Sequence, residues 1–160
     1  MDLVKSVKKL FKIRRRPLFQ ATPVLVDYIE MAKKYLDFPL SDIVRQMMEK
    51  HWPGGLTIIG RCQKNKVTPL VRGNGDNLGV RMPDHEIALQ LIKGVVVPLL
   101  GPSANFHGNA TPFYFKDVDQ KLVKFVDLIL EGECKNNLTS TVVDCSVNPY
   151  RIIREGAVKL

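Results

Sequence analysis

The sequence has no apolar run that approaches the ~18 residues needed to span a bilayer, and its charged beginning lacks the apolar core of a secretory signal. Both absences predict a soluble protein that is not exported. Cysteine is scarce as well: Cys62, Cys134 and Cys145 are odd in number and include no CxxC pair. This usage argues against a disulfide framework and a zinc knuckle, and it is typical of a protein in the reducing cytoplasm.

The signatures of several enzyme classes are also absent. There is no phosphate-binding P-loop, no GxSxG nucleophile elbow, no HExxH helix and no set of closely spaced metal ligands. We therefore predict neither a catalytic side-chain nucleophile nor a metal site built from protein ligands.

Acidic residues are outnumbered, with 16 Asp and Glu against 24 Lys and Arg, which gives a formal charge of +8. Residues 1–20 hold seven of these cations and a single acid, Asp2. Apolar residues recur there at helical spacing, with the lysines between them, until Pro17, so an amphipathic basic helix is predicted. The excess charge favours anionic partners such as nucleotides or RNA.

Predicted helices and strands alternate along the rest of the chain. A helix is expected to begin after Ser41, a good N-cap residue, and to end before residues 52–55. A second is expected between Asp84, as its cap, and Gly94, and a short one near residues 117–124. The side chains of the first two helices that are expected to face the core are Ile43, Val44, Met47, Met48, Ile87, Leu91 and Ile92.

Apolar runs bounded by turn residues predict the strands. Strands interleaved with helices predict one α/β or α+β domain over residues 1–160, with a twisted mixed sheet flanked by helices. A loop rich in Gly, Pro, Ser and Asn is expected at residues 101–112, after an apolar run at 95–100. The other expected strands are 56–60, 78–82, 126–130, 141–145 and 150–154.

Arginines and small polar residues gather at the ends of these segments. Ligands of α/β sheets collect where loops leave the strands, and the arginine fork and serine hydroxyls suit carboxylate and phosphate groups. The pattern is typical of a site that binds a polyanion together with a carboxylate group. Each arginine alone also fits a solvated surface position. The residues concerned are Arg14, Arg16, Arg81, Ser103, Asn105, Ser140, Thr141 and Arg154.

Short motifs in the same segments resemble, in family order, those of the YrdC-like family, whose active members are threonylcarbamoyl-AMP synthases. They extend over nearly the whole chain. Each is weak alone, but the ordered set is specific; Arg14 stands where lysine is usual. The matching segments are KIRRRP at 12–17, PVLV at 23–26, WPGGLT at 52–57, GVRMPDH at 79–85, PSAN at 102–105 with Gly108 and Thr111, STVVD at 140–144, and RIIREG at 151–156.

The resemblance implies a YrdC-like fold and an enzyme that joins L-threonine, bicarbonate and ATP, with Mg²⁺, and releases pyrophosphate. Its product would supply a tRNA threonylcarbamoyl-transferase machinery that modifies position 37 of tRNA. By the same resemblance Arg81 would bind the threonine carboxylate and Ser140 would help to hold that amino acid. The ATP-binding residues would be Arg14, Arg16, Asn77, Ser103, Asn105, Thr111 and Arg154.

One family element has no counterpart here. Members carry a PTDTVYGLG-like strand and turn before the basic helix, so the resemblance implies a domain truncated at its N-terminus that lacks part of the threonine pocket. Two alternatives stay open. The basic helix and the missing wall also fit a non-catalytic module that binds tRNA or double-stranded RNA. Residues 1–16 also fit an amphipathic mitochondrial presequence.

Overall fold

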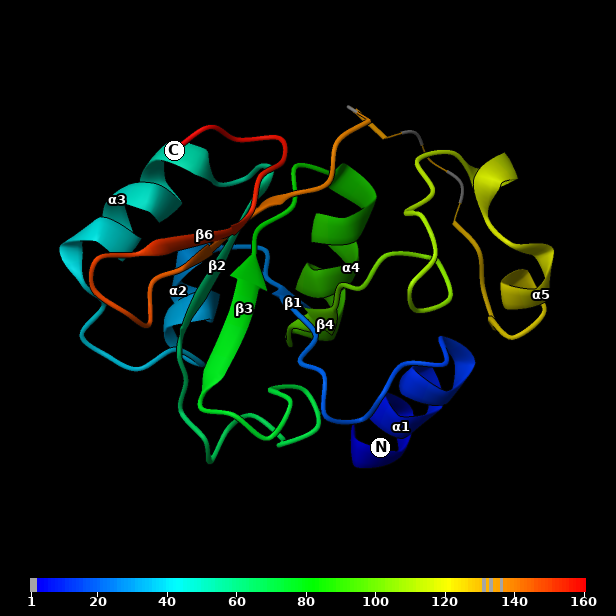
Figure 1. Cartoon of the computed structure of the whole chain (residues 1–160), viewed down its shortest axis with the longest axis horizontal. Coiled ribbons are helices and arrows are strands. Elements are labelled where there is room, and N and C mark those ends of the chain that lie inside the picture. Colours follow the sequence, from blue (N-terminus) through cyan, green and yellow to red (C-terminus); the bar gives the residue numbers. More distant parts are fainter. Residues whose placement is uncertain (1–2, 131, 133, 136) are drawn as a thin grey trace.

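A mixed β-sheet forms the centre of the computed structural model, which describes residues 3–130, 132, 134–135 and 137–160 (Figure 1). Its strands are β1 (Val24–Leu25), β2 (Leu56–Arg61), β3 (Asn77–Arg81), β4 (Leu99–Leu100), β5 (Thr141–Asp144) and β6 (Arg151–Arg154). Neighbours follow the order β4-β1-β3-β2-β5-β6. The pairs β1/β3 and β2/β5 are parallel, and the other neighbours are antiparallel. The predicted α/β class with a mixed sheet is confirmed.

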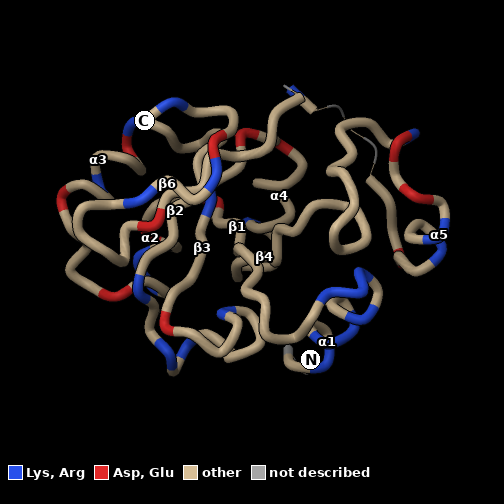
Figure 2. Tube along the Cα trace, in the orientation of Figure 1, with Lys and Arg blue, Asp and Glu red and all other residues tan. Residues whose placement is uncertain are grey.

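Helices surround this sheet. They are α1 (Leu3–Ile13), α2 (Ile29–Lys33), α3 (Asp42–His51), α4 (Glu86–Val95), the 3₁₀ turn η1 (Phe115–Asp117) and α5 (Gln120–Val123). α3 and α5 lie at opposite ends of the long axis of the molecule (Figure 1). Lysines and arginines gather on α1 (Figure 2). None of the helices in the described part of the chain is long and apolar enough to cross a membrane.

The apolar face of α1 is part of the hydrophobic core. Val7 and Phe11, one turn apart, are 3% and 1% exposed, and they join a cluster that includes Met48 of α3 and Ile58 and Val80 of the sheet. Because burying such side chains is the main favourable contribution to folding, the basic helix predicted from the apolar spacing packs as an element of this fold.

The predicted core faces of α3 and α4 are partly wrong. Val44, Met47 and Met48 are buried as expected, but Ile43 is 40% exposed. On α4, Ile92 is fully buried and Leu89 packs against the core, whereas Ile87 and Leu91 are 36% and 43% exposed. α4 contacts the core through Leu89 and Ile92, which lie three residues apart on one face of the helix. Ile87 and Leu91 lie beside this face.

The predicted strand at residues 126–130 does not form. The segment follows α5, at the end of the molecule away from the sheet (Figure 1), and Leu128 is 74% exposed. An apolar run becomes a strand only where another strand pairs with it, and none lies beside this one. Similarly, only β4, the last two residues of the predicted run 95–100, pairs with the sheet.

The ends of α4 also differ from the prediction. Its N-cap is His85, and Asp84, the predicted cap, forms an ion pair with Lys135 at 2.7 Å. The helix continues through Gly94 to Val95, and Val96 takes the left-handed conformation with a φ of 60°. Ser41 does occupy the N-cap of α3, but its side chain makes no capping hydrogen bond.

Candidate active site

The register of the sheet brings residues that are distant in the sequence together at one end of its strands. β2 and β3 are antiparallel with Ile58 opposite Val80, so the beginning of β2 lies beside Arg81 at the end of β3. β5 is parallel to β2, with Thr141 opposite Leu56. Residues that begin β2 and β5 therefore meet residues at the carboxyl end of β3, the kind of strand end outside which α/β sheets hold ligands.

Arg154, at the end of β6, completes this group. Its Nε and Nη2 donate to Ser140 O at 3.0 and 2.8 Å, and Nη2 also lies 3.0 Å from Ser140 Oγ. Ser140 Oγ is in turn 2.9 Å from Thr57 Oγ1, which is buried. We refer to Gly54, Thr57, Arg81, Ser140 and Arg154 as the Arg81–Arg154 cluster.

The two arginines of this cluster carry positive charge without an acidic partner. Arg81 Nε donates to Gly54 O at 2.8 Å. Burial, and then the charge of Arg154, lower the pKa of Arg81. Ion pairs within 4.0 Å among the described residues include neither arginine. Because arginine stays protonated in proteins, the cluster is a site of unneutralised positive charge that favours a bound anion.

A second group forms where α1 ends. Arg14 is only 6% exposed; its Nε donates to Asn105 O at 3.1 Å and its Nη2 to Asn105 Oδ1 at 2.8 Å. Ser103 Oγ lies 3.4 Å from the same Nη2 and donates to Asn105 Oδ1 at 2.7 Å. We call these three residues the Arg14 cluster. Burial, and then the charge of Arg16, lower the pKa of Arg14.

Arg16 lies close to this group but has different partners. Its Nη2 donates to Ala21 O at 2.5 Å, and its buried Nε has no hydrogen-bond partner among the described residues. Burial lowers the pKa of Arg16. A free N–H on a buried guanidinium can still bind an anion.

A cavity of about 510 Å³ opens beside the Arg14 cluster, with Asn105 in its wall. Asn109, Asp117 and Asp119 also line it. Thr111 lies in the same loop and is half-buried. Amide and carboxylate groups of this kind can hydrogen-bond hydroxyl and amino groups of a ligand.

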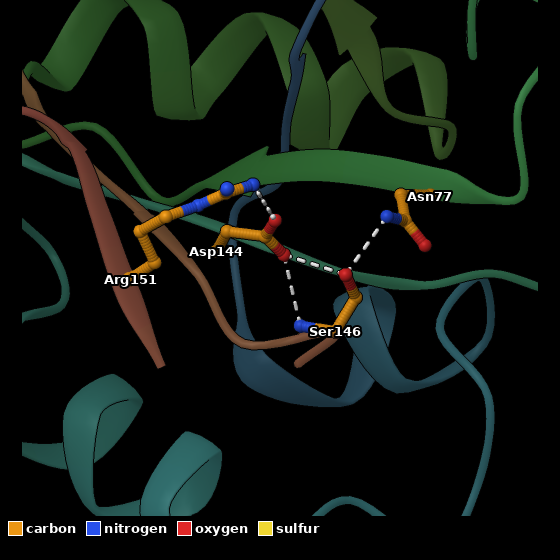
Figure 3. A network of polar contacts seen from close by, with 4 residues as sticks. All are labelled: Asn77, Asp144, Ser146 and Arg151. Carbon is orange, nitrogen blue, oxygen red and sulfur yellow. Dashed lines mark hydrogen bonds and ion pairs between the residues drawn. The ribbon is translucent and has the colours of Figure 1, made fainter. Parts of the chain in front are cut away.

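Asn77 is the predicted site residue that the structure places elsewhere. It begins β3, opposite Arg61, and lies four residue steps, about 13 Å, from Arg81 at the end of the same strand. Its Nδ2 donates to Ser146 Oγ at 2.9 Å. Ser146 in turn bonds to the Asp144 carboxylate, in the network shown in Figure 3. The predicted ATP-binding residues thus fall in two groups, one with Arg154 and one with Arg14, and Asn77 contacts neither among the described hydrogen bonds.

Two residues of the site were missed by the sequence reasoning. Thr57 hydrogen-bonds Ser140, and Gly156 lies so close that a side chain there would come within 2.7 Å of the Ser140 carbonyl carbon. Both lie in motifs that carry the resemblance, WPGGLT and RIIREG. Motif membership was therefore the available signal, but only the tertiary contacts show what these residues touch.

The mixed sheet and its arginine-bearing strand ends define an α/β domain suited to anionic substrates. The sequence profile of the Sua5/YciO/YrdC family, which is described as telomere recombination, matches residues 1–156. The chain belongs to this family.

The curated relatives carry enzyme names. The threonylcarbamoyl-AMP synthase of Bacillus subtilis is 29% identical over 158 residues, which cover 96% of this chain and 44% of that protein. The threonylcarbamoyl-AMP synthase of Pyrococcus abyssi is 30% identical over 157 residues, covering 97% of this chain and 45% of that one. The chain thus spans somewhat less than half the length of these two relatives. Their names give no support to the alternative of a non-catalytic RNA-binding module.

Solved structures agree with the fold. The crystal structure of Pyrococcus abyssi Sua5 complexed with L-threonine superposes with a TM-score of 0.89 at 28% identity, covering 95% of this chain and 44% of that one. Escherichia coli YciO has a TM-score of 0.83 at 23% identity, covering 97% and 75%. The second comparison shows the fold alone, and the first shows a protein of this fold that binds L-threonine.

Proposed function

We propose that residues 1–160 form a YrdC-like domain that makes threonylcarbamoyl-AMP from L-threonine, bicarbonate and ATP. The observation that carries the proposal is the Arg81–Arg154 cluster, in which two arginines without acidic partners lie beside the Ser140 and Thr57 hydroxyl groups. Membership of a family with threonylcarbamoyl-AMP synthases, and a threonine-bound structure of the same fold, support it.

In this proposal Arg81 binds the threonine carboxylate. Its Nε is occupied by Gly54 O, and both terminal nitrogens have no hydrogen-bond partner in the described part of the chain. Those two nitrogens present the parallel donors that a carboxylate accepts. Ser140, which holds Arg154 and Thr57 through its hydroxyl group, helps to orient the amino acid.

ATP is assigned to the remaining cationic and polar residues. The Arg14 cluster is proposed to bind the phosphates and the nucleoside, together with Arg16 and Thr111. Arg154, from the other cluster, is proposed to contact the same ligand. Asn77 is retained only as a prediction by resemblance. Among the described residues no group of three or more His, Cys, Asp or Glu could hold a metal ion. In this proposal Mg²⁺ enters with the substrate as MgATP, held by phosphate oxygens.

The reaction needs positioning and charge neutralisation more than covalent help. Bicarbonate joins the threonine amino group, with loss of water, to give a carbamate. A carbamate oxygen then forms a bond to the α-phosphorus of ATP while the bond to the leaving pyrophosphate breaks. Guanidinium groups that neutralise the phosphoryl oxygens, and hydroxyl groups that hold the carbamate in line, accelerate such a step without a protein nucleophile.

The proposal extends to partners and compartment. The adenylate would pass to a tRNA threonylcarbamoyl-transferase machinery in the cytoplasm, with tRNA as the final acceptor. All three cysteines are free thiols, which is consistent with a reducing compartment.

Threonine-dependent release of pyrophosphate tests the proposal. The folded chain is incubated with MgATP, bicarbonate and L-threonine, pyrophosphate is measured by a coupled assay, and the adenylate is identified by mass spectrometry. Omitting threonine should abolish the signal. Arg45→Gln, which removes an exposed ion pair with Asp42 on α3, serves as the control and should be unaffected. A folded sample without threonine-dependent pyrophosphate would contradict the function.

A further inference from the structure

We call residues 156–158 the C-terminal clamp. One hydroxyl group at the beginning of β5 holds this segment by two hydrogen bonds. Thr141 Oγ1 donates to Val158 O at 2.6 Å and accepts from Val158 N at 3.0 Å. Thr141 is 1% exposed. A buried hydroxyl group that is satisfied both as donor and as acceptor is strongly specified, because losing it leaves the N–H and C=O groups of the partly buried Val158 without this partner.

The clamp is also fastened on the other side of Ser140. Ala157 N donates to Thr139 O at 2.9 Å. Gly156, the first residue of the clamp, lies against the chain between Thr139 and Thr141: a side chain there would come within 2.7 Å of both Ser140 C and Thr141 N. The clamp therefore lies flat against the peptide bond that follows Ser140, with no space for a side chain.

Arg154 belongs to the same stretch of chain as the clamp and precedes it by two residues. Its guanidinium donates to both the carbonyl and the hydroxyl oxygen of Ser140. β6 is an edge strand of the sheet, and all four of its residues are exposed, so packing holds Arg154 weakly. Two attachments therefore place Arg154 against Ser140: its pairing with Val142 of β5 in the sheet, and the clamp, which holds the chain that follows it.

We propose that Thr141 is a positioning residue: through its two hydrogen bonds to Val158 it holds Ser140 and Arg154 in the geometry that binds substrate. The importance for activity rests on the proposed function, in which those two residues contact threonine and ATP. Thr141 is itself buried and acts through them.

The substitution Thr141→Val tests this role because it removes the hydroxyl group and keeps the branched shape. It should weaken the binding of L-threonine, measured by calorimetry in the presence of MgATP, about tenfold. Thr141→Ser keeps the hydroxyl group and should restore the affinity to within about twofold of the wild type. Thr22→Val is the matched control, since Thr22 is 2% exposed and its Oγ1 has no hydrogen-bond partner among the described residues.

A second readout needs no ligand. In the free protein the Arg154 Nε–H, which donates to Ser140 O, should give a resolved, slowly exchanging signal in ¹H–¹⁵N spectra. Its assignment follows from its loss in Arg154→Lys. In Thr141→Val this signal should move to the position of a solvated arginine, and in Thr22→Val and Thr141→Ser it should stay.

The two readouts separate the possible failures. An Arg154 signal that is unchanged by Thr141→Val overturns the positioning role, and so does a failure of Thr141→Ser to restore it. If the signal moves while threonine and ATP bind equally to the wild type, Thr141→Val and Arg154→Lys, the positioning role stands and the proposed substrate site is wrong.

Discussion

Arg14 Nη2 donates to Asn105 Oδ1 at 2.8 Å, a contact that joins the end of α1 to the loop at residues 101–112 across 91 residues of sequence. Asn105 Nδ2 also donates to the carbonyl oxygens of Asn109 and Ala110. The Asn105 side chain thus shapes the loop and accepts a hydrogen bond from a buried arginine. The Arg14 cluster is for this reason a structural unit as well as a candidate ATP site.

Asn105→Ala should therefore destabilise the protein. It removes the bond from Arg14 Nη2 to Asn105 Oδ1 and both bonds from Asn105 Nδ2 to loop carbonyls, while Arg14 Nε keeps the main-chain Asn105 O. Hydrogen bonds to charged groups contribute about 1.5–3 kcal/mol each, so a loss of roughly 2–3 kcal/mol in the free energy of unfolding is expected. Urea denaturation measures it. Asn65→Ala, at an exposed position, should change stability by less than about 0.5 kcal/mol. Equal effects of the two substitutions would refute the structural role.

Arg81→Ala should affect threonine more than ATP. It removes the two terminal nitrogens proposed to bind the carboxylate, and affinity for L-threonine should fall by about 10–100-fold, as for the loss of a charged hydrogen-bonded contact. Arg81→Lys should recover little, because lysine lacks the planar fork. Calorimetric titration with threonine measures both. Undiminished threonine binding in Arg81→Ala would remove Arg81 from the site.

Two glycine substitutions form a matched pair. Gly156→Ala places a methyl group against Thr139 O and the Ser140–Thr141 peptide, so it should displace Ser140 and lower threonine-dependent pyrophosphate release at least tenfold. Gly94→Ala places one in open space within α4 and should stabilise the protein by up to about 1 kcal/mol, because alanine favours helix. If both variants keep full activity, the contact at Gly156 is not functional.

The network around Asp144 predicts an acid-dependent part of the stability (Figure 3). Burial alone would raise the pKa of Asp144, but hydrogen bonds from Ser146 and the Arg151 guanidinium outweigh it and the pKa is lowered. The contribution is therefore complete above the unfolded value of about 3.9 and is lost as the pH falls through the folded value.

Urea denaturation at pH 7, 5 and 3 checks this, on the wild type and on Asp144→Asn. The variant should be less stable at pH 7, and the difference should shrink at pH 3, because pH 3 lies below the unfolded value of the carboxyl. Asp127→Asn, which removes an exposed partner of Lys9, should follow the wild type at every pH. A difference that is independent of pH would show that the charge of Asp144 is not what stabilises the turn.

The three thiols should react at very different rates. Cys134 is exposed, Cys62 is buried, and burial followed by the Asp144 charge raises the pKa of Cys145 to about 11. Burial, as the main cause, also raises the pKa of the Cys62 thiol. At pH 8 only about one in a thousand Cys145 thiols is ionised, and the thiolate is the reactive form. Alkylation by iodoacetamide followed by mass spectrometry should find Cys134 modified first; early labelling of Cys145 would contradict the burial.

Much of the fold could be predicted because local signals and tertiary contacts agree there. The apolar spacing that predicts the basic helix is the spacing of Val7 and Phe11 in the core. The turn residues around 52–55 end α3 and precede β2 as expected. At the site, the register brings Arg81 and Ser140, both predicted to bind threonine, to the same end of the strands, and Arg154 contacts Ser140. The roles of these residues stay predictions.

The failures occurred where the deciding partner lies far away in the sequence. Residues 126–130 are as apolar as a strand, but no neighbouring strand pairs with them. Ile87 and Leu91 have helical spacing, but the line of contact of α4 passes through Leu89 and Ile92. Asn77 belongs to the same strand as Arg81 but lies four residue steps, about 13 Å, away at its other end, and its role at ATP stays a prediction.

The sequence by itself determined the α/β class, the basic helix, the main strands and the ordered motifs that place the chain in its family, because these depend on residue type and local period. Only the tertiary structure decided which polar groups meet. Strand register brought Thr57 to Ser140, the close approach of Gly156 set the C-terminal clamp, and the Thr141 hydroxyl group found its partner in a backbone 17 residues away. Hydrogen bonds are short and directional, so the contacts of a site depend on packing that no local pattern encodes.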